Sequence, residues 1–522
     1  MKQPAITAPD KTLLPGPRRL QINAVLAATQ VVVGAAVLFV LFRFIVRVLG
    51  TEAIGLWSLV MAVTAAIRLG ELGLGAGSIR FVPKQLARGA VQEAAAAAST
   101  ATLSVAAFVL ALCVIVWPFL YWVLGLFVHS AGQLADAHAL MPYALASLWL
   151  AAVSNSITTA LVGCHRADLS SLVGMTGQFL WLAAALLLVP HMGLEGLALG
   201  QVIQYLVTTV AGWLLLGREL RGSGLWMPTW SRKRFMEMWR YGVTQQFISM
   251  AALLGEPLAK MLMARFGNLS LLGVFEMANR LVSQVRMLLV SANQVLVPHY
   301  AGLAETADDA LSRAYIQNVR MITVASSILF SFLAAGLPVI GLLWLGRDEP
   351  GFWIFALLMC FGWYVNLLAV PGFFFNAGIG RLGTNLAHQL VQSAVMLLAG
   401  AVAGSLWGAV GAALAWPIGL TAGTALILTA HTRRERVTVR HTFGSTSAAA
   451  ALVAGAVSAG GLCIYLLLLP RHGLLLVSAA TVGVGLAGWV CFFAFAPQAR
   501  RLMREFSIFP PPTTHADRPT QL

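Results

Sequence analysis

Residues 22–57 read INAVLAATQVVVGAAVLFVLFRFIVRVLGTEAIGLW, a nearly uninterrupted apolar stretch that leads into a pair of glycines, Gly50 and Gly55. A helix needs about 20 mainly apolar residues to cross the hydrocarbon core of a bilayer, so residues 22–49 predict a transmembrane helix. The stretch is too long for the apolar region of a signal peptide and has no clear cleavage site. We therefore expect an uncleaved first helix.

The same pattern continues along the whole chain. Its 522 residues are 59% hydrophobic and only 10% charged, with a mean hydropathy of +0.81, whereas soluble proteins are roughly 45–50% apolar and about 25% charged. We therefore expect an all-α polytopic membrane protein. About fourteen transmembrane helices are predicted, near 22–49, 54–80, 94–124, 139–163, 170–190, 194–217, 241–266, 269–296, 317–345, 352–377, 383–404, 407–430, 446–469 and 473–496.

The net charge of +15 reflects topology rather than nucleic-acid binding. Most of the 34 Lys and Arg residues fall in alternate connections, beginning with Arg18 and Arg19 in the N-terminal segment. Cytoplasmic loops of membrane proteins carry an excess of Lys and Arg. We therefore expect a multi-pass membrane protein with both termini in the cytoplasm.

An internal repeat organises the chain. Five positions recur at nearly constant offsets: Gly50 and Gly55 as Gly267 and Gly273, Pro83 as Pro298, and Gly193 and Gly196 as Gly408 and Gly411. The offsets, 215 to 218 residues, predict two copies of one six-helix unit. An even number of helices gives both copies the same orientation, as in transporters whose halves are related about the membrane normal.

The repeat predicts six segments. The two lobes are separated by a basic, Trp-containing linker that we expect at the membrane interface. The segments are the cytoplasmic N-terminal tail 1–21, the first six-helix lobe 22–217, the cytoplasmic interfacial linker 218–240, the second six-helix lobe 241–430, two additional transmembrane helices in 431–496, and the cytoplasmic C-terminal tail 497–522.

Ionisable residues at bilayer depth cost several kcal/mol and mark functional sites. In this chain they are confined to the spans 22–49, 54–80, 241–266 and 269–296. The basic residues follow the repeat, because Arg43, Arg47 and Arg68 correspond to Lys260, Arg265 and Arg286 at offsets of 217 or 218. Two ion pairs are expected at i,i+4 spacing on one helix face, Glu256 with Lys260 and Glu276 with Arg280.

These residues predict a solvated, net positive cavity. A basic cavity attracts phosphate, to which Arg can donate two parallel hydrogen bonds. The expected substrate-binding residues are Arg43, Arg47, Arg68, Lys260, Arg280 and Arg286. The acids Glu71, Glu256 and Glu276 are candidates for ion coupling, because a carboxyl in a membrane cavity can carry protons. Snorkelling of the residues near helix ends and a purely structural Glu276–Arg280 pair are the alternatives.

Motifs for catalysis are missing. The sequence has no G-x-x-x-x-G-K-[ST] phosphate loop, no H-E-x-x-H and no Cys/His metal cluster, and its outer loops are short. We therefore expect neither an enzyme nor a cofactor nor a bound metal. The five cysteines show no metal or redox spacing.

Two stretches carry a family resemblance, RVLGTEAIGLWSLVMAVTAAIRLGELGLGAGSIRFVPKQLARG (47–89) and EPLAKMLMARFGNLSLLGVFEMANRLVSQVRMLLVSANQVLVPHYAGLAE (256–305). Both resemble the bacterial polysaccharide flippases of the multidrug/oligosaccharidyl-lipid/polysaccharide exporter superfamily. The resemblance covers the first twelve spans and rests on glycine spacing and helix order. The residues that match the family pattern, as structural turns, are Gly50, Gly55, Gly267, Gly273, Pro83 and Pro298. Glu256 and Phe275 depart from it, since the family often has Asp and Tyr there.

The resemblance implies a two-lobed bundle in the bacterial plasma (inner) membrane that moves a polyprenyl-pyrophosphate-linked saccharide outward by alternating access. Its partners would be that lipid-linked substrate, membrane lipid and other polysaccharide assembly proteins, with no nucleic acid. Three alternatives stay open: a multidrug exporter, a peptidoglycan-precursor exporter of the same fold, and a non-transporting scaffold of a polysaccharide assembly complex. The excess of cations argues against an exporter of organic cations.

Overall fold

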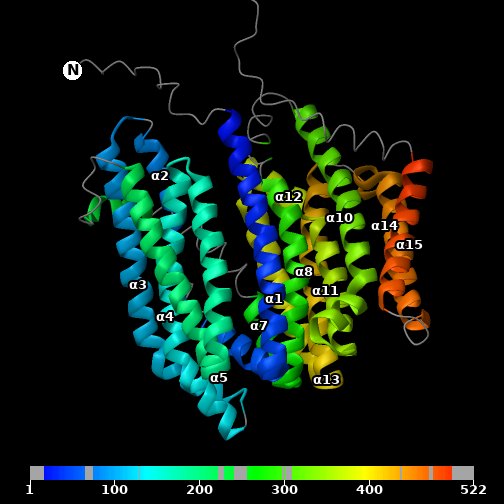
Figure 1. Ribbon diagram of the computed structural model, residues 1–522. Helices are drawn as coiled ribbons and strands as arrows, with labels where there is room; N and C mark the ends of the chain where they lie inside the picture. The colour runs from blue at the N-terminus through cyan, green and yellow to red at the C-terminus, as the bar shows by residue number, and fades with distance from the viewer. Residues whose placement is uncertain are drawn as a thin grey trace, which may run out of the picture. The chain divides into compact units, whose positions relative to one another are not determined.

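The computed structural model describes residues 17–64, 67, 74–86, 88–128, 130–220, 229–239, 255–294, 296, 300, 308–435, 438–468 and 474–496. Within these residues the chain forms helices and no strand (Figure 1). The helices are α1 (Pro17–Thr64), α2 (Leu74–Leu86), α3 (Val91–Gly125), α4 (Ala131–Gly163), α5 (Ala167–Glu219), α7 (Gly255–Phe266), α8 (Leu269–Gln294), α10 (Asp308–Leu345), α11 (Pro350–Leu367), α12 (Val370–Gly378), α13 (Leu382–Glu435), α14 (Val439–Leu468) and α15 (Leu474–Phe495). The prediction of an all-α membrane protein is confirmed.

Nine helical stretches in the described part of the chain are long and apolar enough to cross a membrane. Four of them are kinked at a glycine with positive φ, namely α1 at Gly50, α5 at Gly193, α13 at Gly408 and α14 at Gly444. Glycine adopts this conformation without the steric cost that a Cβ atom imposes. The kinks in α5 and α13 lie between two predicted spans, so each of these helices contains two of the predicted fourteen.

The sequence repeat is also present in the backbone. Gly193 has φ 59° and ψ −134°, and Gly408, 215 residues later, has φ 60° and ψ −138°. The same offset separates the ends of α4 and α12 and the starts of α5 and α13. It also relates His165, the one non-glycine residue with positive φ in the described chain, to Gly380. The two copies therefore turn at equivalent places.

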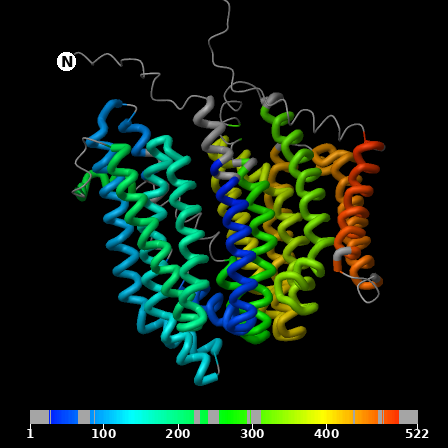
Figure 2. The backbone as a smooth tube through the Cα atoms, viewed as in Figure 1, coloured from blue at the N-terminus to red at the C-terminus, as the bar shows by residue number. Residues whose placement is uncertain are grey.

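Two compact units emerge from the contacts, and each is described by itself. The first comprises Met1–Gln284, Gly341–Met359 and Leu386–Gly423, and the second comprises Val285–Ile340, Cys360–Asn385 and Thr424–Leu522. The division into six-helix lobes at 22–217 and 241–430 remains a proposal from the repeat. In the first unit α3, α4 and both halves of α5 stand side by side (Figure 2).

Small and branched apolar residues make up the core of the first unit, and the core of the second unit adds aromatic residues. In the first unit α2 to α5 meet around Val82, Ala94, Ala98, Ile157 and Leu216. In the second unit α10, α14 and α15 meet around Val324, Ala450, Val457, Trp489 and Phe492. Small residues let membrane helices approach closely and gain dispersion energy, which is what drives their association in lipid.

Close approach is most marked where the second half of α1 crosses α8. A methyl group at Gly55 would overlap the backbone oxygen of Leu269, and one at Gly273 would overlap that of Thr51. Thr51 Oγ1 and Ser270 Oγ are hydrogen-bonded at 2.8 Å beside this crossing.

The glycines predicted as turns therefore have different roles. Gly50 is a kink and Gly267 a bend between α7 and α8. Gly55 and Gly273 instead lie inside helices, as small residues at an interface. Pro83 lies within α2, and Pro298 is outside the described residues.

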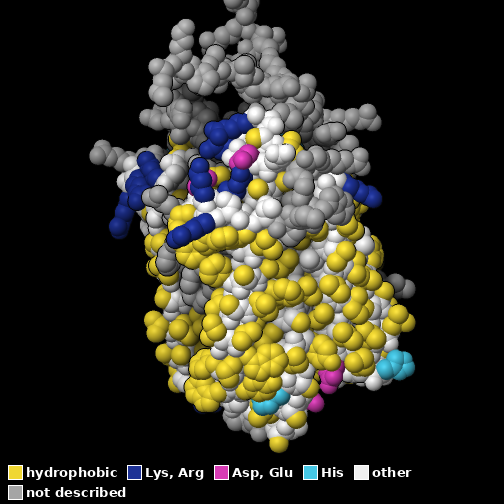
Figure 3. All heavy atoms as spheres, turned by 90° about the vertical axis from the view of Figure 1, so that its left-hand side faces the viewer, with side chains coloured by type: hydrophobic (Ala, Val, Ile, Leu, Met, Phe, Trp, Pro, Cys, Tyr) yellow, Lys and Arg dark blue, Asp and Glu magenta, His cyan; other side chains and the backbone are white. Residues whose placement is uncertain are grey.

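The face of the first unit seen in Figure 3 carries a broad band of hydrophobic side chains, with Lys and Arg gathered at one end. Val114 and Ile115 on α3 and Leu187 on α5 are 67%, 69% and 71% exposed. Exposed apolar surface on this scale is typical of a surface that lies against lipid. Lys84 and Arg88 are among the exposed basic residues.

The described part of the predicted linker, residues 229–239, packs along α3. Trp230 Nε1 donates a hydrogen bond to Ser104 Oγ at 3.0 Å, and the ring of Phe235 lies 6.0 Å from that of Phe108. Arg234 pairs with Glu93. Trp230 remains 53% exposed, and an exposed Trp among basic residues is typical of a membrane-interface anchor.

Candidate functional site

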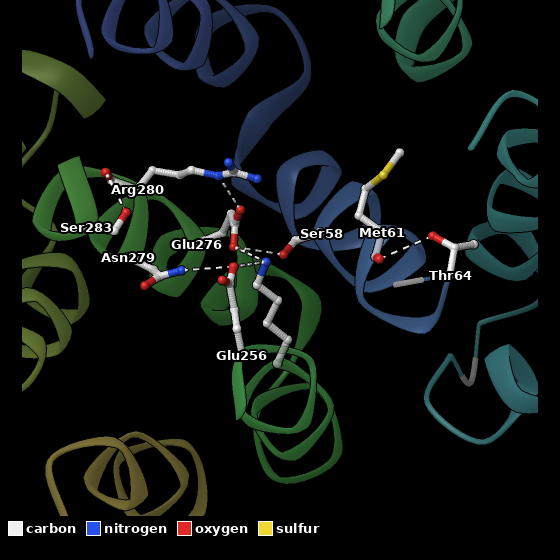
Figure 4. Close-up of polar contacts among 9 residues, drawn as sticks. Ser58, Met61, Thr64, Glu256, Glu276, Asn279, Arg280 and Ser283 are labelled. Carbon is white, nitrogen blue, oxygen red and sulfur yellow. Dashed lines mark hydrogen bonds and ion pairs between the residues drawn. The ribbon is translucent and has the colours of Figure 1, made fainter. Parts of the chain in front are cut away.

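A cluster of four charged side chains links α7 and α8 in the first unit (Figure 4). Lys260 Nζ lies 2.8 Å from Glu256 Oε1 and 2.9 Å from Glu276 Oε2. Arg280 Nε lies 2.7 Å from Glu276 Oε1. Both ion pairs predicted from i,i+4 spacing are therefore present, and Lys260 joins them into one network across the two helices.

Neutral side chains complete the network. Ser58 Oγ, on α1, donates to Glu276 Oε2 at 3.1 Å, and Asn279 Nδ2 donates to Glu256 Oε1 at 3.2 Å (Figure 4). Glu276 thus has three partners. These contacts form because Gly267 bends the chain between α7 and α8, while the Gly55–Gly273 crossing holds α1 against α8.

Burial divides the network into a closed centre and two open ends. The Glu276 and Lys260 side chains are 2% and 6% exposed, whereas those of Glu256 and Arg280 are 49% and 42% exposed. Two acids and two bases balance the charge. Lys260 is enclosed between carboxylates, so the cation most open to a ligand here is Arg280.

Arg280 is held through only part of its guanidinium group. The Nε atom binds Glu276, whereas Nη1 and Nη2 form no ion pair among the described residues. In Figure 4 one nitrogen of this group is joined to Glu276 by a dashed line, and the other two are drawn without one. A guanidinium fixed at one edge can still donate two hydrogen bonds to an anion from its other edge.

The remaining predicted basic residues lie elsewhere. Arg43 and Arg47 are on α1, half-buried and exposed, and neither forms an ion pair within the described residues. Arg286 lies in the second unit, where its guanidinium stacks 4.0 Å from the ring centre of Trp363. Its Nε is buried without a hydrogen bond. Arg68 and Glu71 fall outside the described residues.

Sequence reasoning missed Ser58 and Asn279 because both are uncharged. A signal for Ser58 existed, since it precedes Glu276 by 218 residues, the repeat offset found for Gly55 and Gly273. Equivalent positions near the crossing are expected to face each other. Among the residues that the structure describes, no group of three or more His, Cys, Asp or Glu side chains could hold a metal ion.

Solved structures resemble the fold closely. A multidrug resistance MATE family transporter of the MOP superfamily, inward-facing, matches 80% of this chain and 98% of its own with 15% identity and a TM-score of 0.67. The Lipid II flippase MurJ, inward closed, matches 91% and 99% with 14% identity and a TM-score of 0.68. A MOP superfamily transporter from Pyrococcus furiosus matches 83% and 100% with 14% identity and a TM-score of 0.59. The chain therefore has the fold of the MOP-superfamily transporters.

Sequence comparison gives the family within that class. The model of the polysaccharide biosynthesis protein family matches residues 22–303, more than half of the chain. The chain therefore belongs to the polysaccharide biosynthesis protein family. A search of curated proteins finds no sequence that matches it.

Proposed function

We propose that this protein is a flippase, or exporter, for an anionic polyprenyl-pyrophosphate-linked saccharide in surface polysaccharide biosynthesis. It would move the lipid from the cytoplasmic to the outer leaflet by alternating access of the two proposed lobes. The proposal combines the polysaccharide biosynthesis family with the transporter fold. Among the similar structures is a Lipid II flippase, which at 14% identity supports the fold alone.

The observation that carries the proposal is the charge network of α7 and α8. Ionisable residues at this depth cost several kcal/mol, and a scaffold has no need to keep four of them. Both open ends of the network are half-exposed, which suits contact with a ligand or with water. Its closed centre, Lys260 with Glu276, would fix the geometry of those ends.

Arg280 is the proposed phosphate contact of the network. Glu276 fixes its Nε edge, and Ser58 and Lys260 fix Glu276 in turn. Such a chain of partners restricts the guanidinium to one direction and reduces the entropy lost on binding. Arg43, Arg47, Arg68 and Arg286 are proposed as further basic groups along the path of the substrate, as their equivalence in the repeat suggests.

Ion coupling is proposed for Glu256 rather than Glu276. Glu276 has three partners and is 2% exposed, whereas Glu256 contacts Lys260 and Asn279 and is 49% exposed. Two neighbouring cations stabilise the charged form of a carboxylate, which makes it a poor proton carrier. Glu71 remains a candidate from the sequence alone.

Energetics favour a hydrated, partly cationic path. A charged group moved into hydrocarbon without compensation costs tens of kcal/mol by Born solvation. With a negative cell interior, outward movement of an anion is favoured by about 2.3 kcal/mol per charge per 100 mV.

We propose a bacterial inner-membrane location with both termini cytoplasmic, and transport rather than catalysis.

A deletion strain tests this function. The gene is deleted, and surface polymer and polyprenyl-linked intermediates are measured after complementation with wild type, Arg280→Gln or Arg265→Gln. Arg265 is an exposed arginine at the end of α7, the helix that precedes α8, and lies outside the network, so it serves as the control. We expect loss of polymer and build-up of intermediates in the deletion strain, rescue by wild type and Arg265→Gln, and failure of Arg280→Gln at normal membrane levels.

Three other results would contradict the proposed substrate or the proposed role of Arg280. Unchanged polymer with increased sensitivity to cationic drugs would replace the proposal with a multidrug exporter. Loss of viability with build-up of the peptidoglycan precursor would replace it with a precursor exporter. Full rescue by Arg280→Gln would remove Arg280 from the substrate path.

A further inference from the structure

A pocket lined by uncharged polar side chains lies in the first unit, between α1, α4 and α5. Its volume is about 390 Å³, within the range of about 300–1,000 Å³ typical of small-molecule sites. Every lining residue is uncharged, and most have a hydroxyl or amide group, including Gln30, Ser154, Asn155, Gln204, Tyr205 and Thr208. The charged residues of the site described above are not among them.

Helical periodicity explains how these groups converge. Ser154 and Asn155 lie on one face of α4, with Ala151 three and four residues earlier. Gln204 and Thr208 are four residues apart on the second half of α5, so both face the same way. The pocket forms where this face of α5 meets α4 and α1, in helices that are otherwise strongly apolar.

The polar groups are not all used for packing. Ser154 Oγ donates to Thr208 Oγ1 at 3.0 Å, which ties α4 to α5. Gln204 is only 9% exposed, yet its Oε1 accepts no hydrogen bond. A buried polar atom without a partner costs about 1–3 kcal/mol. Asn155 is exposed and Tyr205 half-exposed at the pocket, so both can reach a ligand.

Most of these polar residues are missing from the second copy of the repeat. At the offset of 215 found for the kinks and helix ends, six of the eight polar lining residues have an apolar or glycine counterpart, whereas Gln30 and Ser170 correspond to Gln245 and Asn385. Ser154, Asn155, Gln204, Tyr205 and Thr208 correspond to Ala369, Val370, Gly419, Leu420 and Gly423. The repeat unit therefore forms without most of this polar set, which points to a ligand in the first copy.

The chemistry of the pocket selects the ligand class. With amides and hydroxyls but no charge, it can donate and accept hydrogen bonds without attracting an ion. Tyr205 adds an aromatic face with a polar tip, which suits a ring that is apolar on one side and hydroxylated at its edge. The pocket and Arg280 both belong to the first unit.

We propose that this pocket binds the first sugar of the lipid-linked saccharide, while its pyrophosphate contacts Arg280. The proposal rests on the flippase function and deepens it, because it assigns recognition of the uncharged sugar to α1, α4 and α5. Discrimination between sugars then comes from the first copy of the repeat, and the charge network holds the part common to all polyprenyl pyrophosphates.

Equilibrium binding in lipid nanodiscs tests the pocket. Two probes are compared, polyprenyl pyrophosphate carrying one hexose and the same lipid without sugar. The variants Asn155→Val and Tyr205→Leu each place the residue of the second copy in the first. Tyr143→Leu is the control, a half-buried tyrosine on α4 that does not line the pocket.

We expect wild type and Tyr143→Leu to bind the hexose-bearing lipid more tightly than the bare lipid. Asn155→Val and Tyr205→Leu should weaken binding of the hexose-bearing lipid about tenfold, equivalent to about 1.4 kcal/mol or one hydrogen bond, and leave bare-lipid binding unchanged. An unchanged ratio of the two affinities in both variants would overturn the pocket and spare the flippase. If wild type binds neither lipid, the proposed function fails, and the pocket with it.

Discussion

Replacement of Lys260 by methionine tests whether the charge network is held together as the distances indicate. Methionine keeps the length and apolar stem of lysine but removes the ammonium group that lies 2.8 Å from Glu256 and 2.9 Å from Glu276. Two carboxylates then face the same gap without the cation between them. We expect Lys260→Met to be the most destabilising single change in the network.

The burial of each group sets the expected size. Loss of one partner from a buried ion pair costs about 3–5 kcal/mol, because the remaining charge is left without compensation. Glu276 keeps Arg280 at 2.7 Å and Ser58 at 3.1 Å, so we expect the lower end of that range. Glu256 is 49% exposed, so Glu256→Gln should cost no more than about 1 kcal/mol, as for surface pairs.

The free energy of unfolding can be measured by titrating the detergent-solubilised protein with SDS and following tryptophan fluorescence. A second variant, Lys260→Met with Glu276→Gln, removes the buried acid along with the buried base. It should be more stable than Lys260→Met alone, because no charge at the centre is left unpaired. The reasoning fails if Lys260→Met is no more destabilising than Glu256→Gln.

Three further changes test other parts of the structure. Gly55→Ala should lower the unfolding free energy by about 1–3 kcal/mol or more, since the added methyl would overlap a backbone oxygen of α8. Gly455 has open space around it, so Gly455→Ala should be neutral or stabilising in the same titration. His165→Gly should raise the melting temperature slightly, because His165 has φ 60° and a glycine at that φ avoids a steric cost of about 1 kcal/mol. A lower melting temperature would contradict this. Trp363→Leu should cost about 0.5–2 kcal/mol through loss of its stacking with Arg286, and Trp363→Phe should cost less; equal losses would argue against a cation–π contribution.

Much of the fold could be predicted from the sequence because the bilayer imposes a length on every apolar helix. Twelve of the predicted spans lie largely on described helices, parts of the spans 54–80 and 241–266 lie outside the described residues, and the repeat recurs in the backbone angles of Gly193 and Gly408. What could not be predicted is where helices from distant parts of the chain cross. Gly55 and Gly273 were expected as turns, because glycine spacing alone does not separate a turn from a helix crossing.

The candidate site was predictable only within single helices. Spacing of i,i+4 anticipated Glu256 with Lys260 and Glu276 with Arg280. The link from Lys260 to Glu276 depends on the bend at Gly267, which spacing does not encode. The sequence also suggested an excess of cations, whereas pairing within the network leaves Arg280 as its most open base.

The uncharged pocket escaped sequence reasoning for a different reason. Its polar residues are spread over three helices, and each hydroxyl or amide changes the hydropathy of its helix only a little. Comparison of the two repeat copies would have revealed it, since Asn155 and Tyr205 correspond to Val370 and Leu420 at the repeat offset. Differences between internal repeats therefore carry information that intramembrane charges alone do not.

Transport by the purified protein tests the central claim most directly. The protein is reconstituted into liposomes that contain hexose-bearing polyprenyl pyrophosphate, and the appearance of the sugar on the far leaflet is followed with an impermeant sugar-oxidising reagent. We predict that wild type speeds this movement, that a potential opposing the anion slows it, and that Arg280→Gln lowers the rate at least tenfold while Arg265→Gln does not. The account would be contradicted if the hexose-bearing lipid moved no faster than in protein-free liposomes while the same protein moved an organic cation.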